Sequence, residues 1–183
     1  MTAPLAQLGD AQLMAGVQQG EQAAFATLAT RHHGRCFALA WRILNDRAEA
    51  EDAVQEAFLK IWNNALLYSP AKGNFAGWLT RIVTNCALDR RRMVKNVTAL
   101  EEADWVEDEA PRADRTAEAA DLHRLMAVMP NRQRAAITLF YIEGYSMNEV
   151  AELMQSNAKA VESMLSRGRQ ALKDMIALQA QAV

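Results

Sequence analysis

The chain has 183 residues, of which 51 % are hydrophobic and 23 % are charged, and its formal net charge is −2. This balance is typical of a folded globular protein and excludes a disordered chain, and no apolar run approaches the roughly 18 residues that cross a bilayer. Residues 1–10 contain no basic cluster followed by an apolar stretch, so we expect a cytoplasmic protein without membrane association. Glycine (8) and proline (4) are few, while Ala, Leu, Met, Gln, Glu and Arg dominate, which predicts an all-α fold.

Two amphipathic helices are predicted in the first 46 residues. The first begins near Asp10, which has the side chain of an N-cap, and ends at Gly20. The second ends at Asn45 and Asp46, and its apolar face repeats every three or four positions. The residues of that face are Phe25, Leu28, Ala29, His32, Cys36, Leu39, Ala40 and Ile43.

A third helix is predicted over EDAVQEAFLKIW, from Glu51 to Trp62. Its apolar stripe follows the spacing i, i+3, i+4, i+7 and i+11 of an amphipathic helix. The stripe consists of Val54, Ala57, Phe58, Ile61 and Ala65, and the opposite face carries Asp52, Gln55, Glu56 and Lys60. The sequence therefore predicts one buried face and one polar, mainly acidic face.

A loop and a long fourth helix follow. Residues 68–74 (YSPAKGN) are predicted to be a loop, because proline and glycine stop helix propagation. The fourth helix, Asn74 to Arg92, has Phe75, Trp78, Leu79, Ile82, Val83 and Cys86 on one face and ends in the basic run Arg90, Arg91, Arg92 and Lys95. A cationic C-terminus complements the helix dipole. Three successive arginines are more than this effect requires, so we expect them to contact phosphates. Trp62 and Trp78 adjoin apolar stripes and are expected in the core.

After residue 96 the sequence loses its helical periodicity and becomes acidic. Between Ala99 and Pro111 there are six acids and no base, so the rest of the chain carries a net charge of +4. Helical periodicity fails there, which predicts an acidic linker over residues 97–117 between a domain of residues 1–96 and a second domain of residues 118–183. Because the linker offers no core to join them, the two domains are expected to be separable.

The second domain has the pattern of a helix-turn-helix. A stripe of Leu122, Leu125, Met126 and Met129 stops at Pro130, and a helix from Asn131 to Glu143 stops at Gly144. Ser146 to Glu149 fits a capping box for a short helix, the turn is Gln155-Ser156-Asn157, and a last helix begins at Ala158. One face of this last helix is polar and suited to a DNA major groove: Lys159, Glu162, Ser163, Ser166, Arg167 and Gln170, with Arg169 at its margin.

The sequence gives no support for an enzyme, a metal site or a cofactor. It contains no phosphate-binding glycine motif and no H-E-x-x-H motif, and His32, His33 and His123 have no further ligands at suitable spacing. Cys36 and Cys86 are expected to be buried thiols and not a disulfide.

Two segments resemble regions of a known family. The segments Glu51–Trp62 and Asn74–Arg92 resemble the second conserved region of sigma-70-type RNA polymerase sigma factors. Residues 129–172 (MPNRQRAAITLFYIEGYSMNEVAELMQSNAKAVESMLSRGRQAL) resemble the fourth region. Two regions joined by a short linker are typical of the extracytoplasmic-function (ECF) group.

The resemblance implies partners and roles for particular residues. The partner would be core RNA polymerase, through its β′ clamp helices and its β subunit. The residues that would bind it are Asp52, Gln55, Glu56 and Lys60. The −10 promoter element would be engaged, with a base flipped from the stack, by Tyr68, Lys72, Asn74, Phe75, Trp78, Arg81, Asn85, Arg90, Arg91 and Arg92. The −35 element would be read by Lys159, Glu162, Ser163, Ser166, Arg167 and Gln170, and a cognate anti-sigma factor would inhibit the protein.

The last helix departs from the family pattern, and an alternative function is open. Members often read T-V-K-S-R-L-S-R-A-R where this chain has Ala160 to Arg169, so Glu162 and Met164 replace two frequently basic positions. Glu162 either accepts a hydrogen bond from a cytosine or faces solvent. The alternative function is a conventional helix-turn-helix regulator with an N-terminal sensory or dimerisation bundle, which would leave the first two matching segments unexplained.

Overall fold

The computed structural model describes residues 4–97, 126, 127 and 129–181, with side chains for residues 4–90, 126, 127 and 129–177. Within these ranges every regular element is a helix, which confirms the all-α prediction. The acidic linker residues Ala99–Pro111 and the stripe residues Leu122 and Leu125 lie outside the described part of the chain. No described helix has the length and apolar character of a membrane span.

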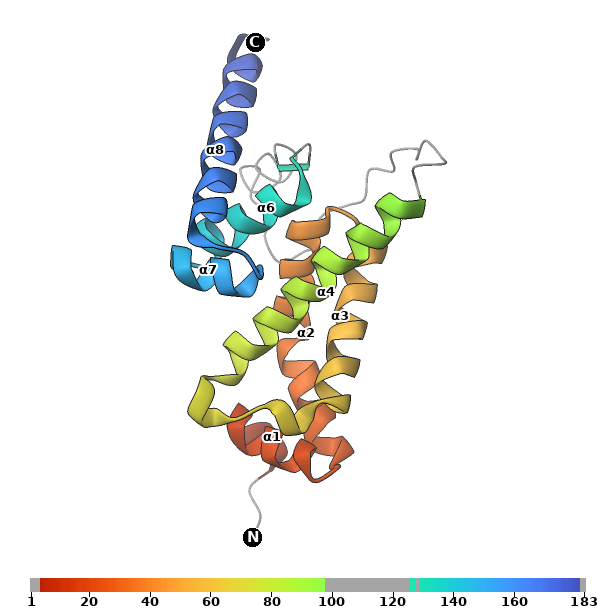
Figure 1. Cartoon of the computed structure of the whole chain (residues 1–183). Coiled ribbons are helices and arrows are strands. Elements are labelled where there is room, and N and C mark those ends of the chain that lie inside the picture. Colours follow the sequence, from red (N-terminus) through yellow and green to blue (C-terminus); the bar gives the residue numbers. More distant parts are fainter. Residues whose placement is uncertain (1–3, 98–125, 128, 182–183) are drawn as a thin grey trace.

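The first domain is a bundle of three long helices on a short base. Helix α1 spans Asp10–Gln18, α2 spans Gln22–Leu44, α3 spans Arg47–Asn63 and α4 spans Phe75–Val97, and a short 3-10 turn, η1 (Leu5–Gln7), precedes α1. Helices α2, α3 and α4 pack side by side, and α1 closes one end of the bundle (Figure 1). Between α3 and α4 the chain forms two further 3-10 turns, η2 (Ala65–Leu67), which precedes the predicted loop of residues 68–74, and η3 (Pro70–Lys72), which lies within it.

The boundary between α2 and α3 follows the sequence prediction. Asn45 adopts a left-handed conformation with φ of 55°, and its backbone N–H donates to Trp41 O. Asp46 then caps α3 by accepting a hydrogen bond from Glu49 N, so α3 begins at Arg47, four residues before the predicted Glu51.

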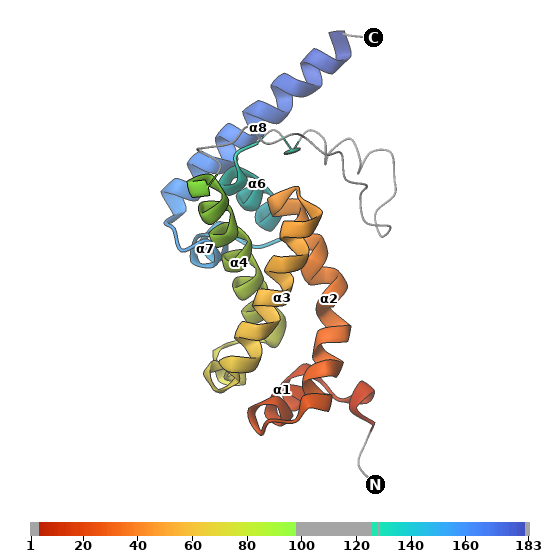
Figure 2. The same cartoon turned by 90° about the vertical axis from the view of Figure 1, so that its right-hand side faces the viewer.

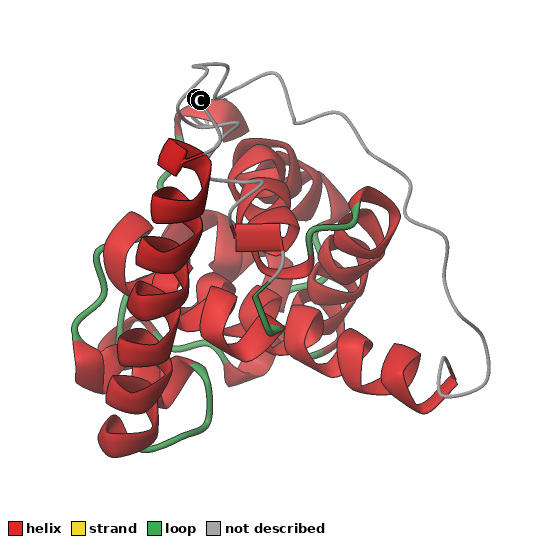
Figure 3. Ribbon diagram, turned by 90° about the horizontal axis from the view of Figure 1, so that it is seen from above, coloured by secondary structure: helices red, strands yellow, loops and turns green. Residues whose placement is uncertain are grey.

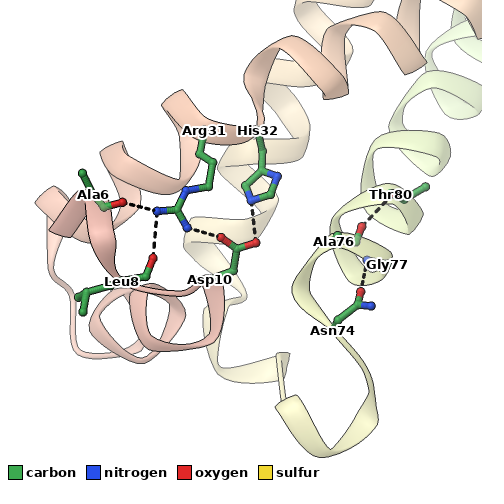
Figure 4. A network of polar contacts seen from close by, with 9 residues as sticks. All are labelled: Ala6, Leu8, Asp10, Arg31, His32, Asn74, Ala76, Gly77 and Thr80. Carbon is green, nitrogen blue, oxygen red and sulfur yellow. Dashed lines mark hydrogen bonds and ion pairs between the residues drawn. The ribbon is translucent and has the colours of Figure 1, made fainter.

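The predicted N-cap at Asp10 is wrong. Gly9 occupies the cap position, where its N–H donates to the Gln12 side chain. The Asp10 carboxylate instead accepts hydrogen bonds from Arg31 (2.6 Å) and lies 2.9 Å from His32 Nε2, both on α2 (Figure 4). Arg31 also donates to the carbonyl oxygens of Ala6 and Leu8. A long-range ion pair therefore outcompetes local capping and fixes the N-terminal segment on α2.

The second domain contains the predicted helix-turn-helix. Helix α6 spans Asn131–Ile137 and continues as a π-helical turn, η5 (Thr138–Ile142), before Gly144 turns the chain with φ of 76°. Helix α7 (Met147–Leu153) starts with the capping box of Ser146 and Glu149, and α8 spans Ala158–Gln181. Asn157 caps α8 by accepting from Ala160 N. The boundaries of α7 and α8 confirm the prediction.

The two domains are packed against each other in this structure. Helix α6 contacts α2 and α4, and α7 contacts α4, so α7 lies beside α4 in both side views (Figures 1 and 2). Seen from above, the described part of the chain consists of helices and loops, with no strand (Figure 3). Side-chain contacts between helices far apart in sequence therefore join the two domains in addition to the linker, and their expected separability stays a prediction.

Candidate nucleic-acid and protein interfaces

The polar face of α3 is open to solvent. Asp52 and Gln55 are exposed and Glu56 and Lys60 are partly exposed, as the amphipathic pattern predicts. Lys60 Nζ lies 2.7 Å from Glu56 Oε1, an i,i+4 ion pair. Leu59 is 61 % exposed beside these charges, although sequence periodicity did not single it out. The face thus combines acids with an exposed aliphatic side chain, a composition suited to a protein partner.

Arg90 at the end of α4 is committed to α3. Its Nε donates to Glu49 Oε2 at 2.8 Å and its Nη2 donates to Asp52 Oδ2 at 2.6 Å. These carboxylates compete with the expected phosphate contact of Arg90, which stays a prediction. Arg91 and Arg92 lie on α4, with side chains outside the described residues.

Aromatic side chains anchor the loop between η2 and α4. The Tyr68 ring centroid lies 5.8 Å from that of Phe75 and 5.4 Å from that of Trp78, and Phe75 packs edge-on against His32. Tyr68 and Phe75 are buried and Trp78 is partly buried. In this structure the two rings hold the loop on the bundle, and the expected contact of Tyr68 and Phe75 with DNA stays a prediction.

The polar side chains near this loop remain accessible. Lys72, Asn74 and Arg81 are exposed and Asn85 is partly exposed. Asn74 Oδ1 accepts from Gly77 N, which caps the start of α4 (Figure 4). A cleft of about 640 Å³ lies beside them, lined on the α4 side by Lys72, Asn74, Trp78 and Arg81 and on the other side by Tyr145, Glu149, Glu152 and Leu153.

The polar face of α8 has the exposure that the sequence predicts. Lys159, Glu162, Ser166, Arg167 and Gln170 are exposed and Ser163 is partly exposed. Gln170 Nε2 donates to Asp174 Oδ1 at 2.8 Å, which orients its amide along the helix. The opposite face is buried through Val161, Leu165 and Gly168. The structure brings the six candidate residues onto one helix that a major groove would accommodate.

The two cysteines are buried and free, as expected. Burial raises the pKa of the Cys36 thiol to about 12 and also raises the pKa of Cys86. Among the described residues no group of three or more His, Cys, Asp or Glu side chains is arranged to hold a metal ion.

Two segments of the chain match models of protein families. Residues 28–96 match the model of sigma-70 region 2, and residues 119–172 match a model of sigma-70 region 4. The chain belongs to the sigma-70 family of RNA polymerase sigma factors. The region 2 match thus covers α3 and most of α2 and α4, and the region 4 match covers α6, α7 and the first part of α8.

Several relatives of this sigma factor are named as members of the ECF group. The chain is 34 % identical to the ECF sigma factor SigM of Mycobacterium tuberculosis over 91 % of this chain and 84 % of that protein. It is 32 % identical to the sigma-H factor of Pseudomonas aeruginosa, covering 92 % and 94 % of the two chains. It is 34 % identical to the ECF sigma factor SigE of Mycolicibacterium smegmatis, over 86 % of this chain and 65 % of that protein's length.

Solved structures share the fold of this sigma factor. CnrH, in complex with the cytosolic domain of CnrY, matches with a TM-score of 0.61 and 27 % identity over 92 % of this chain and 97 % of that chain. The sigma factor RpoE of Bartonella quintana, in complex with the anti-sigma factor NepR, has a TM-score of 0.68 and 21 % identity over 84 % and 96 % of the two chains.

Sequence reasoning missed the side chains that join the two regions. Arg134 on α6 is 2 % exposed and reaches the end of α2, and Glu143 lies near Arg35 and Arg42 of α2. One signal was available: Met126, Pro130, Arg134 and Ile137 follow helical spacing, so the arginine sits on an otherwise apolar face. A charge on such a face indicates a buried polar contact.

Proposed function

We propose that this sigma factor recruits core RNA polymerase through α3 and reads promoters through two separate surfaces. The observation that carries the proposal is the match to regions 2 and 4 in order. The exposed candidate side chains of both regions support it. A conventional DNA-binding regulator would have no need of region 2, so the family match favours the sigma factor over that alternative.

The polymerase would dock on the polar face of α3. Asp52 and Glu56 supply negative charge, Gln55 supplies hydrogen bonds, and Leu59 adds apolar area that would become buried. Charged rims and desolvated apolar centres are the usual anatomy of a protein interface. Arg90 would contribute by holding Asp52 in place and not by touching the polymerase or DNA.

The −10 element would bind at the loop of residues 68–74 and the first turns of α4. Lys72, Asn74, Trp78 and Arg81 line the adjoining cleft, so a base flipped out of the stack would meet an indole, an amide and two cations there. Unstacking a base costs a few kcal/mol, which stacking and hydrogen bonds would offset. Tyr68 and Phe75 would hold this loop on the helical bundle. Further along α4, Asn85, Arg91 and Arg92 would contact the same DNA strand.

The −35 element would be read by α8. Ser163, Ser166 and Gln170 offer hydrogen bonds to base edges, and Lys159 and Arg167 offer contacts to phosphates.

We also propose regulation by a protein partner, a cognate anti-sigma factor. The relative CnrH, solved with the cytosolic domain of CnrY, supports a protein partner for this group.

Run-off transcription tests the proposal. Core polymerase is incubated with fragmented genomic templates, with and without the purified chain, and new 5′ ends are mapped. We expect transcripts that depend on the chain and share two upstream sequence elements. If no template responds although the chain is folded and binds core polymerase, promoter recognition by this protein is refuted.

A further inference from the structure

Gln18, the last residue of α1, bonds to the backbone that leads into the loop of residues 68–74, named here the −10 loop. Its side-chain Nε2 donates to Ala65 O and to Tyr68 O, each at 3.0 Å. These acceptors lie 47 and 50 residues further along the chain. The amide nitrogen has two N–H donors, one for each carbonyl. One side chain of α1 thus spans the backbone from η2 to the first residue of the −10 loop.

The backbone at these acceptors is extended. Tyr68 has φ of −73° and ψ of 134°, and Ser69, which precedes η3, has φ of −139° and ψ of 124°. Extended residues outside a sheet have no regular backbone partners for their carbonyls. Ala65 O also accepts from Tyr68 N, whereas the bond to Tyr68 O comes from the Gln18 amide. Gln18 therefore gives the start of the −10 loop a bond that helix geometry does not supply.

Helix α1 is itself fixed on the bundle, so it presents Gln18 from a rigid position. Its apolar side is buried through Leu13, Met14 and Val17. Its first residue, Asp10, accepts from Arg31 and lies 2.9 Å from His32 Nε2, both on α2 (Figure 4). A side chain on a packed helix holds its partner more precisely than one on a loop does. Helix α1 thus connects α2 at one end with the segment after α3 at the other (Figure 1).

A second contact reaches the −10 loop from α2. The His32 ring centroid lies 5.3 Å from that of Phe75, and Phe75 packs against Tyr68 and Trp78 at 5.8 Å and 6.1 Å. Apolar packing has little directional preference, whereas a hydrogen bond requires a narrow geometry. The rings therefore hold the side chains of the loop on the bundle, and Gln18 sets the position of its backbone.

Gln18 acts from behind the surface that would meet DNA. The cleft beside the loop is lined on the loop itself by Tyr68, Ser69, Lys72 and Gly73, and in the described part of the chain Gln18 does not line it. Gln18 is partly buried. Any effect of Gln18 on a DNA strand in the cleft must therefore pass through the conformation of the loop.

We propose that Gln18 is a positioning residue for the −10 element, which holds the −10 loop in the conformation that captures a flipped base. The inference rests on the proposed function, because that function assigns the loop to DNA. The match to sigma-70 region 2 begins at residue 28, so the role belongs to a helix that the match does not cover. A loop that is held before DNA arrives does not have to be ordered during binding, so less of its contact energy is lost.

Four variants isolate the two donors of Gln18. Gln18→Met removes both donors at nearly the same side-chain length and adds no charge, so a change in DNA binding would not be electrostatic. Gln19→Met makes the same replacement at the exposed neighbouring residue and is the matched control. Gln18→Lys tests rescue, because an ammonium group also donates to carbonyls. Gln19→Lys controls for the added charge.

Amide hydrogen exchange of the free full chain, followed by mass spectrometry, reports whether the loop is held. The N–H groups of Tyr68, Lys72 and Gly73 donate to backbone carbonyls of this segment, so they are protected while its turns persist. We expect peptides that cover residues 65–74 to exchange at least about fivefold faster in Gln18→Met, and to return toward the parental rate in Gln18→Lys. Peptides of α2 and α3 should exchange at the parental rate in every variant.

Capture of a base is measured with the holoenzyme on a promoter that run-off transcription has mapped. The −10 element carries 2-aminopurine, whose fluorescence rises when the base leaves the stack. We expect Gln18→Met to lower the rate of this rise about fivefold, the effect of about one lost hydrogen bond, and Gln19→Met to match the parent. Gln18→Lys should equal Gln19→Lys. Affinity for core polymerase should be the same in all variants, because the polar face of α3 is unchanged.

Unaltered exchange of residues 65–74 in Gln18→Met overturns the positioning role, and so does faster exchange with an unaltered rate of base unstacking. Faster exchange throughout α2 and α3 would also overturn it, because Gln18 would then act on overall stability. A parent chain that supports no run-off transcription refutes the proposed function instead. Loop exchange in the free chain would still decide whether Gln18 holds the loop.

Discussion

At the scale of single residues, the acids of α3 offer the most direct test of polymerase binding. Asp52→Lys and Glu56→Lys should each weaken binding to core polymerase by about tenfold, or about 1.4 kcal/mol, because they invert the charge of an exposed face. Fluorescence polarisation with labelled chain measures the affinity. Glu21→Lys, on α2's N-cap, should bind as the parent does, and equal affinities for all four proteins would exclude α3 from the interface.

Arg90 and Arg91 are neighbours with different expected roles. Arg90→Gln breaks the ion pairs to Glu49 and Asp52, so we expect it to weaken core binding about threefold, within the range of a partly exposed ion pair. Its effect on DNA should be small. Binding of the holoenzyme to several promoters at several salt concentrations, measured beside core affinity, separates these effects. If the affinity of the Arg90→Gln holoenzyme for promoters depended less on salt than that of the parent, Arg90 would be shown to contact a phosphate.

Arg91→Gln is the variant in which we expect DNA binding, and not core binding, to change. It should weaken holoenzyme binding to all promoters alike and reduce the slope of affinity against salt, because it removes a phosphate contact that releases counterions. Core affinity should stay unchanged. A loss restricted to one −10 sequence would show that Arg91 reads a base.

Glu162 tests how α8 reads DNA. The side chain is exposed at the centre of the polar face, so we expect Glu162→Lys to raise affinity for every −35 sequence without re-ranking them, since an added cation attracts phosphates. Selection from a randomised −35 library measures the ranking. A change of preferred base, worth about 1–3 kcal/mol for one lost contact, would show that Glu162 pairs with a cytosine.

At the scale of elements, the close approach of α6 and α8 depends on Gly168. A Cβ at Gly168 would clash with Ile137 Cδ1 and lie 3.2 Å from Ile137 Cγ1. Gly168→Ala improves helix propensity by about 1 kcal/mol, but we expect overpacking to outweigh this and to lower the free energy of unfolding by about 1 kcal/mol. Ile137→Val, which shortens that side chain, should restore or exceed parental stability in the double variant. Urea denaturation followed by circular dichroism gives the values, and additive effects would show that the two residues do not compete for space.

At the scale of the whole molecule, the domain boundaries remain a prediction. A fragment of residues 118–183 should fold as a helical domain, because α6, α7 and α8 share a core that includes Leu139, Val150 and Leu165. It should be less stable than region 4 within the full chain, because Arg134 loses the carbonyls of α2. Thermal denaturation by circular dichroism tests both points. A fragment with no cooperative transition would show that region 4 needs region 2 to fold.

Local signals in the sequence were sufficient for most elements. The Asn45–Asp46 boundary, the capping box of Ser146 and Glu149, and the turn before Ala158 were predicted because each is stabilised by groups within a few residues. The amphipathic stripes gave the exposed faces of α3 and α8 for the same reason.

Contacts between distant residues could be found only in the tertiary structure. Asp10 pairs with Arg31, Arg90 with Asp52, and Arg134 with the end of α2. From the sequence, Asp10 was expected to be an N-cap and Arg90 to be part of a basic run, and no role was expected for Arg134. Which partner a charged side chain binds depends on distances that helix packing sets. The sequence therefore determined the helices and the family of this protein, while the packing of helices decided which charges remain free for polymerase and DNA.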